Sequence, residues 1–181
     1  MYKIIILMGL SVVLLGCQVM TVSECQHANW AELGRQDGLR GYSANVYSRS
    51  DACLKHQVVI PAEKIAQYQR SYTTAIHQYC QPQNIFNLAI AGEGRISACP
   101  EPQYSQVKTI YVVGSNYYKK KQEIEEVQQR IRWLDEKIDE TQNRQQRYEY
   151  MDEQRKKAKL LNRLLDEQKV LQRELDWIRP R

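Results

Sequence analysis

The last third of the chain contains almost no residue that ends a helix. After Pro102 the only glycine is Gly114 and the only proline is Pro180. Apolar residues recur there at alternating spacings of three and four, which is the pattern of a coiled-coil seam. The first seam comprises Ile124, Val127, Ile131, Leu134 and Ile138, and the second comprises Leu161, Leu164, Gln168, Leu171, Leu175 and Ile178. The sequence therefore predicts long amphipathic helices over residues 117–181.

The two seams are not in one heptad register. Residues 141–151 between them are rich in Gln, Asn and Arg and offer little to a core, and Asp152 followed by Glu153 is typical of a new helix start. We therefore expect an antiparallel helical hairpin; the alternative is one long helix that self-associates through two offset seams. In the hairpin, Ile131, Leu134 and Ile138 would lie opposite Leu161, Leu164 and Leu171.

The N-terminus has the pattern of an export signal. Lys3 is followed by residues 4–15 without a charged side chain, which has the proportions of a secretory signal peptide. A bilayer span needs about 20 apolar residues, so this segment is too short for a permanent membrane helix. It ends in Leu14-Leu15-Gly16-Cys17, a lipobox, in which the small residue before cysteine allows cleavage by the lipoprotein signal peptidase.

We therefore expect residues 1–16 to be removed and Cys17 to become the lipidated first residue of the mature protein. Two or three acyl chains hold a protein stably on a membrane, and residues 17–24 would form a short tether. Gln18 follows the lipidated cysteine, where an Asp usually retains lipoproteins in the inner membrane of Gram-negative cells. We accordingly expect the outer membrane, with the protein facing the periplasm.

With Cys17 lipidated, four of the five cysteines remain. An even number in an oxidising compartment indicates disulfide bonds, and four cysteines allow three pairings. We favour Cys25–Cys53 and Cys80–Cys99, because each pair closes a short loop between neighbouring elements. In the chain-entropy description a disulfide that closes a loop of this length stabilises the fold by about 3 kcal/mol.

A zinc site is the alternative use of two of these cysteines. Cys53-x-x-His56 and His77-x-x-Cys80 place thiols and imidazoles at the spacing of zinc ligands. Disulfide bonds form readily in the expected compartment, so we expect neither a metal nor another cofactor.

Residues 25–116 are predicted to form a small helical domain that the disulfides staple. Helices are expected over residues 28–41, 45–57 and 61–79, followed by a loop over 84–102 with one short helix. Overall the chain is predicted to be mainly α, with this stapled domain followed by the long hairpin.

Three glycines, Gly34, Gly38 and Gly41, lie at i, i+4 and i+7 of the first helix. A glycine costs a helix up to about 1 kcal/mol relative to alanine, so their placement indicates close approach of another helix or a left-handed cap at the helix end. Asp37 within this run is either a functional carboxylate or, preferably, a hydrogen-bonding residue. Trp30 supplies an apolar contact.

These residues resemble an uncharacterised proteobacterial lipoprotein family of unknown function (DUF2799-like), to which this chain adds a C-terminal coiled-coil segment. The resemblance covers about residues 25–114. It rests on Trp30-x-x-x-Gly34-x-x-Asp37-Gly38-x-x-Gly41, Ala52-Cys53, Tyr79-Cys80, Gly92, Cys99-Pro100 and Tyr111-x-x-Gly114. It implies a location and a fold, and no activity.

Catalytic motifs are missing from the sequence. It contains neither Gly-x-Ser-x-Gly nor His-Glu-x-x-His, and no glycine-rich phosphate loop. The 26 Lys and Arg residues are spread over both halves against 21 Asp and Glu, which leaves no basic face for nucleic acid.

We therefore expect a non-enzymatic interaction or accessory protein of the cell envelope that binds the membrane through its lipid and has an envelope protein as its candidate partner. A structural envelope spacer is the alternative, and a metal-binding protein or enzyme is the least favoured. The candidate interaction residues are Trp30, Asp37, Ile131, Leu134, Leu164 and Leu171.

Overall fold

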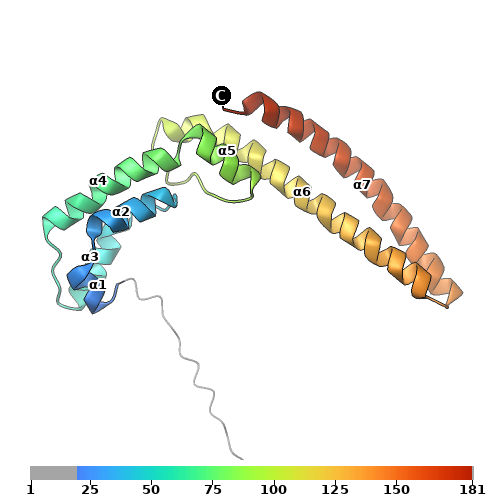
Figure 1. Cartoon of the computed structure of the whole chain (residues 1–181), viewed down its shortest axis with the longest axis horizontal. Coiled ribbons are helices and arrows are strands. Elements are labelled where there is room, and N and C mark those ends of the chain that lie inside the picture. Colours follow the sequence, from blue (N-terminus) through green and yellow to red (C-terminus); the bar gives the residue numbers. More distant parts are fainter. Residues whose placement is uncertain (1–19, 181) are drawn as a thin grey trace, which may run out of the picture.

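The computed structural model describes residues 20–180, and within that range the chain is helical and has no strand. The helices are α1 (Val22–His27), α2 (Trp30–Leu39), α3 (Val46–Lys55), α4 (Ala62–Tyr79), α5 (Pro82–Ile90), α6 (Gln103–Glu140) and α7 (Arg144–Ile178). They form an arch, with α1–α4 as one arm and the pair α6–α7 as the other (Figure 1). The mainly α fold is thus confirmed; the expected signal peptide, Cys17 and Gln18 lie outside the described residues.

Local capping explains where several helices begin. Thr21 and Glu24 form a capping box at α1, in which the Glu24 amide donates to Thr21 Oγ1 and the Thr21 amide donates to the Glu24 carboxylate. Asn29 caps α2 by accepting from the Glu32 amide at 3.1 Å. Residues 22–24 of the tether expected over residues 17–24 therefore belong to helix α1.

The two disulfides are Cys25–Cys53 and Cys80–Cys99, with Cα–Cα distances of 5.5 and 5.7 Å. The predicted pairing is confirmed. Each bond lies in a separate hydrophobic cluster. The Cys25 cluster contains Met20, Cys25, Trp30, Val46, Cys53, Ile60 and Tyr68. The Cys80 cluster contains Ile76, Tyr79, Cys80, Ile85, Phe86, Cys99, Val107, Ile110, Val113 and Leu175.

Helices α2 and α4 approach each other closely along the glycine face of α2. A Cβ added at Gly34 would lie 2.2 Å from the Tyr68 carbonyl oxygen, and one added at Gly38 would lie 2.7 Å from the Ala75 Cβ. Gly41 follows the helix and has a φ of +67°, a left-handed conformation that favours glycine. Both explanations of the glycine pattern hold, each at different positions.

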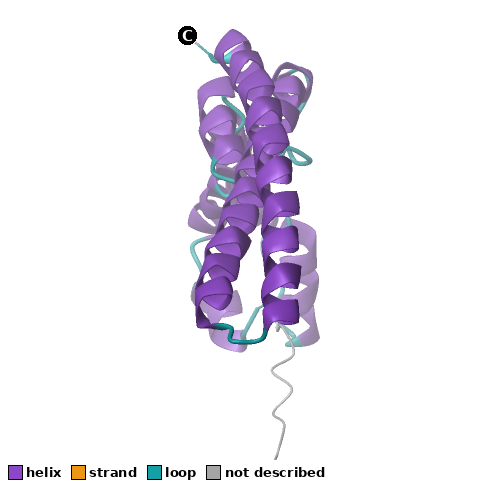
Figure 2. Cartoon of the chain, turned by 90° about the vertical axis from the view of Figure 1, so that its right-hand side faces the viewer, coloured by secondary structure: helices purple, strands orange, loops and turns teal. Residues whose placement is uncertain are grey.

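Helices α6 and α7 run antiparallel side by side and are joined by a short turn (Figure 2). The predicted hairpin is confirmed. At 1.5 Å per residue, the 38 residues of α6 extend over about 57 Å. The predicted start of the second helix is wrong, because α7 begins at Arg144 and not at Asp152. Asn143 caps α7 by accepting from the Gln146 amide, and the exposed first two turns consist mostly of good helix formers, which need no apolar stripe.

The earlier start of α7 also changes the register of the hairpin. Leu164 packs with Ile124 and Val127, and the half-buried Ile131 packs against these three residues. Leu134 is fully buried nearer the turn, where the neighbouring Trp133 ring meets Tyr150 edge to face. The predicted opposition of residues 131, 134 and 138 to residues 161, 164 and 171 is therefore wrong, because a shorter turn moves every α7 residue to a partner further from the tip.

The base of the hairpin belongs to the core of the stapled domain. Val107, Ile110 and Val113 of α6 lie in the Cys80 cluster together with Leu175 of α7. The boundary expected between residues 116 and 117 consequently falls inside α6. One continuous helix thus connects the stapled domain to the hairpin.

Candidate functional site

The most conspicuous polar feature of the stapled domain is a buried ion pair. Asp37 on α2 is only 6 % exposed. The Arg49 guanidinium on α3 donates to both Asp37 carboxylate oxygens, at 3.0 and 2.9 Å. The Tyr68 hydroxyl on α4 donates to the same carboxylate at 2.6 Å and accepts from the Asn45 amide at 2.9 Å. Three helices are therefore joined through one carboxylate.

The surroundings of this network indicate a structural role for Asp37 and Tyr68 and not a catalytic one. Burial raises the pKa of Tyr68 well above its usual value, and the hydrogen bond and negative charge of Asp37 act in the same direction. The phenol thus remains a hydrogen-bond donor at neutral pH. Both Asp37 oxygens already accept hydrogen bonds, so this carboxylate is not placed to act as a general base. A buried hydrogen-bond network that links three helices orients the helices that carry it.

Arg49 was not among the residues singled out from the sequence. It lies three residues after Val46 and four before Cys53, both of which are buried on α3. That spacing places Arg49 on the inner face of the helix, and a cation on an inner face needs an anionic partner. The spacing of Arg49 from Val46 and Cys53 therefore indicates an inward-facing basic residue, which needs an acidic partner such as Asp37.

A solvent-exposed hollow of about 330 Å³ lies beside the ion pair. It is lined by Asp37, Arg40, Tyr42, Ser43, Ala44, Asn45 and Arg49. Arg95 stacks over the Tyr42 ring at 4.6 Å. Arg49 is already neutralised by Asp37, so the hollow does not hold a free pair of converging cations for an anion.

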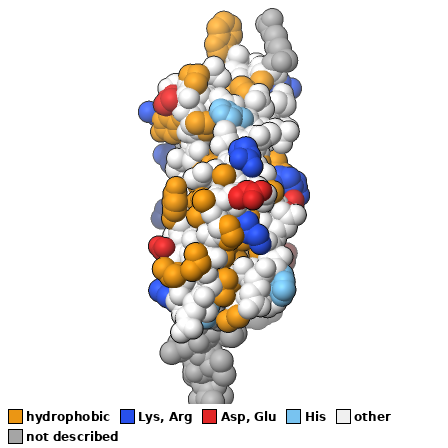
Figure 3. All heavy atoms as spheres, turned by 90° about the vertical axis from the view of Figure 1, so that its left-hand side faces the viewer, with side chains coloured by type: hydrophobic (Ala, Val, Ile, Leu, Met, Phe, Trp, Pro, Cys, Tyr) orange, Lys and Arg blue, Asp and Glu red, His pale blue; other side chains and the backbone are white. Residues whose placement is uncertain are grey.

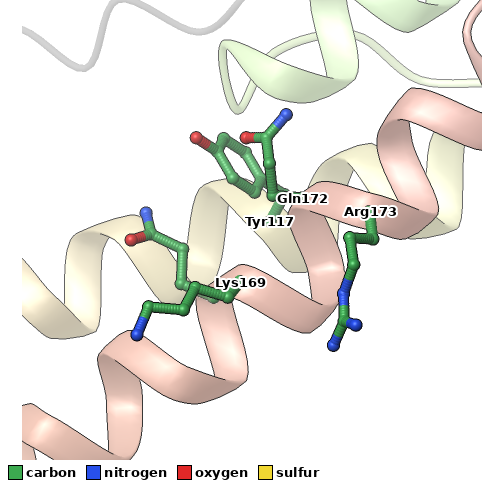
Figure 4. A pocket seen from close by; sticks show the side chains of 5 residues that line it. Tyr117, Lys169, Gln172 and Arg173 are labelled. Carbon is green, nitrogen blue, oxygen red and sulfur yellow. The ribbon is translucent and has the colours of Figure 1, made fainter.

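A second groove, of about 590 Å³, lies between α6 and the last third of α7. It is lined by Tyr117, Gln168, Lys169, Gln172 and Arg173. Figure 4 shows the Tyr117 and Gln172 side chains next to each other, whereas Lys169 and Arg173 extend in other directions. The groove therefore lacks polar groups that converge on one ligand position.

The six candidate interaction residues lie mostly in the core. Trp30, Asp37, Leu134 and Leu164 are buried, and Ile131 and Leu171 are half-buried. Their side chains stabilise the stapled domain and the hairpin. They do not form an accessible surface, so a partner cannot bind through these six side chains.

Several other apolar side chains are exposed, and two sets of them are candidate interaction surfaces. One set, Tyr47, Leu54 and Val59, lies on α3 and on the connection to α4. The other set follows the hairpin and comprises Trp133, Tyr148, Met151, Val170 and Trp177. Figure 3 looks onto the end of the molecule that carries the first set and shows hydrophobic side chains in several patches among charged ones.

The zinc alternative loses its thiol ligands. Cys53 and Cys80 are each bonded to another cysteine, and His77 forms a short hydrogen-bond contact with Gln103. Among residues 20–180 no group of three His, Cys, Asp or Glu side chains is placed to hold a metal ion. In the same part of the chain no helix is both long and apolar enough to cross a bilayer.

A comparison with known protein families finds a match for one segment of the chain. A family model described as "Protein of unknown function (DUF2799)" matches residues 29–116. No curated protein and no solved structure matches the chain significantly. The matched segment contains α2 to α5, the Cys80–Cys99 disulfide and the base of α6. Residues 29–116 thus constitute a domain of the DUF2799 family of unknown function, which this chain extends with a helical hairpin.

Proposed function

We propose that this protein is a lipoprotein that Cys17 anchors in the outer membrane and that acts in the periplasm as a non-enzymatic interaction or accessory protein. The observation that carries the proposal is the lipobox Leu14-Leu15-Gly16-Cys17. The two disulfides support it, because structural disulfides persist in oxidising compartments such as the periplasm.

The hairpin supports an interaction role. Its outer faces are charged and well solvated, yet Trp133, Tyr148 and Met151 remain exposed near the turn. Aromatic residues and methionine are enriched in protein interfaces. Arg144, Arg147, Tyr148 and Met151 also line a hollow of about 350 Å³ there. A protein partner of the envelope is the occupant that this mixture of aromatic and basic groups suits.

A structural spacer is the second candidate, and the length of α6, about 57 Å, favours it. Photo-crosslinking residues placed at Tyr148 and, as a control, at exposed Lys108 separate the two. An interaction protein gives a defined crosslinked species in intact envelopes from position 148 and none from position 108. A spacer gives no stoichiometric product at either position.

The anchor itself is tested with Cys17→Ser. This variant should accumulate as an unprocessed precursor and lose labelling by a fatty-acid probe. Gln18→Asp should keep the label and move the protein to inner-membrane fractions. Normal labelling of Cys17→Ser would refute the lipoprotein assignment, and wild-type protein in inner-membrane fractions would refute the sorting.

A further inference from the structure

The folded domain begins very close to the expected lipid anchor. Met20 is 2 % exposed and belongs to the Cys25 cluster, and its sulfur lies 3.8 Å from an Arg49 nitrogen. Cys17 and Met20 are three residues apart in the sequence. An extended chain covers at most about 3.6 Å per residue, so the Cα atoms of these two residues are at most about 11 Å apart.

So short a connection holds one end of the domain against the bilayer. The interfacial region on each side of the hydrocarbon core is about 5–8 Å thick. If Cys17 carries the lipid, as proposed above, Met20 lies within about 11 Å of that region. The elements that surround Met20 then lie next to the membrane, because the tether is too short to hold them far from it.

Exposed apolar side chains lie on these same elements. Helix α1 contacts α3, and the Cys25–Cys53 disulfide joins them. Tyr47 and Leu54 are seven residues apart and therefore lie on one flank of α3. They are 65 % and 58 % exposed, and Val59 in the connection to α4 is 76 % exposed. The Gln69 amide donates to the Tyr47 hydroxyl at 3.1 Å, which holds the ring in place.

We infer that this end of the stapled domain, formed by α1, α3 and residues 57–61, rests on the lipid bilayer. Tyr47, Leu54 and Val59 enter the headgroup region. Tyrosine suits this position, because its ring is apolar while its hydroxyl keeps a polar partner, here the Gln69 amide. The lipid chains supply the attachment, and the protein surface determines how the domain is oriented on the membrane.

The inference rests on the lipid anchor and has its own test. The full-length lipidated protein is reconstituted in vesicles of phosphatidylethanolamine and phosphatidylglycerol that contain a phospholipid with a photoactivatable diazirine near the headgroup. After illumination, peptides are mapped by mass spectrometry. Peptides with Tyr47, Leu54 and Val59 should carry several-fold more lipid than those with Val112 and Val170, which are 48 % and 54 % exposed on α6 and α7.

One triple-substituted protein and one double-substituted control test which residues contact the lipid. Tyr47→Ser/Leu54→Ser/Val59→Ser should lose the preferential labelling of residues 46–60, whereas Val112→Ser/Val170→Ser should keep it. Uniform labelling, or labelling that avoids residues 46–60, overturns the inference while the lipoprotein assignment stands. An N-terminal peptide without lipid on Cys17 overturns both, because the tether that orients the domain is then absent.

Discussion

The Cys25 end of the stapled domain and the helical hairpin are stabilised in different ways, although both are helical. Helices α1, α2 and α3 have only 6, 10 and 10 residues, and isolated helices shorter than about 12–15 residues are marginal in water. They are held by a disulfide, by glycine contacts and by a buried ion pair. Helices α6 and α7 are 38 and 35 residues long and are held by a repeated apolar seam. Short helices need specific cross-links, whereas long helices accumulate many ordinary contacts.

The ion pairs of the stapled domain and of the hairpin also differ, in how far their carboxylates are buried. In the stapled domain, Asp37 is buried and Arg49 is partly buried, so the carboxylate depends on its guanidinium partner. In the hairpin, Lys120–Glu167 and Arg130–Glu153 join the two helices beside the seam, and their acidic side chains are 46 % and 36 % exposed, against 9 % for the Asp37 side chain. Exposed pairs contribute little to stability. The hairpin therefore tolerates charge changes that the stapled domain does not.

The largest effect is expected from Asp37→Ala. Removing the carboxylate leaves the partly buried Arg49 guanidinium without its partner and the Tyr68 hydroxyl without its acceptor, which should cost about 3–5 kcal/mol of unfolding free energy. Urea unfolding followed by circular dichroism measures the loss. Asp37→Leu/Arg49→Met is the matched control and should lose clearly less, because neither charge remains. Equal losses in both proteins would show that packing, and not the unpaired charge, determines the effect.

Removing the disulfide at this end should cost nearly as much. With a sequence separation of 28 residues, Cys25→Ala/Cys53→Ala is expected to lose about 3–4 kcal/mol in the chain-entropy description. The thermal midpoint of this variant, compared with the wild-type protein with and without reductant, measures the effect. A midpoint unchanged by the substitution would mean that the short helices do not depend on the cross-link.

A cavity in the hairpin seam should have an intermediate effect. Leu164 is buried against Ile124 and Val127, so Leu164→Ala should lose about 2–3 kcal/mol. Val170→Ala on the exposed face is the control and should change the unfolding free energy little. A loss at position 164 as large as that of Asp37→Ala would contradict the proposed division between the two regions.

The smallest effect is expected from the Arg130–Glu153 pair. Its hydrogen bond with Arg130 lowers the pKa of Glu153 below the usual value, so the coupling between the two residues is present at neutral pH. It should fade as the pH falls through the lowered pKa, because Glu153 then becomes protonated. A double-mutant cycle with Arg130→Ala and Glu153→Ala at two pH values and two salt concentrations measures it. A coupling insensitive to salt would indicate a buried pair and contradict the exposed geometry.

The features predictable from the sequence are those determined by local patterns. The seams of alternating apolar residues predicted the hairpin, and the spacing of Cys25, Cys53, Cys80 and Cys99 predicted the pairing. Gly34 and Gly38 predicted a close helix contact. In each case the pattern and its structural consequence lie on the same element or on neighbouring ones.

The features that were missed depend on the geometry between elements. The turn of the hairpin was expected to be longer, because residues 144–151 lack an apolar stripe, although a solvated helix does not need one. Because the turn is shorter than expected, Leu164 also packs against other residues of α6 than those predicted. The partner of Asp37 is Arg49, on a helix whose orientation is determined by the complete fold. Likewise, the accessibility of Trp30 depends on what the other helices cover.

The placement of Leu175 in the Cys80 cluster also has a consequence for the order of folding. Every residue of the Cys25 cluster precedes Val107 in the chain, so that cluster can form before the hairpin has emerged into the compartment where the chain folds. The Cys80 cluster, in contrast, remains open until α7 has emerged and brought Leu175 onto Ile76, Phe86 and Val113. During that interval these side chains form an apolar surface without its final cover, which is where a partly emerged chain is most prone to aggregation and most in need of a chaperone.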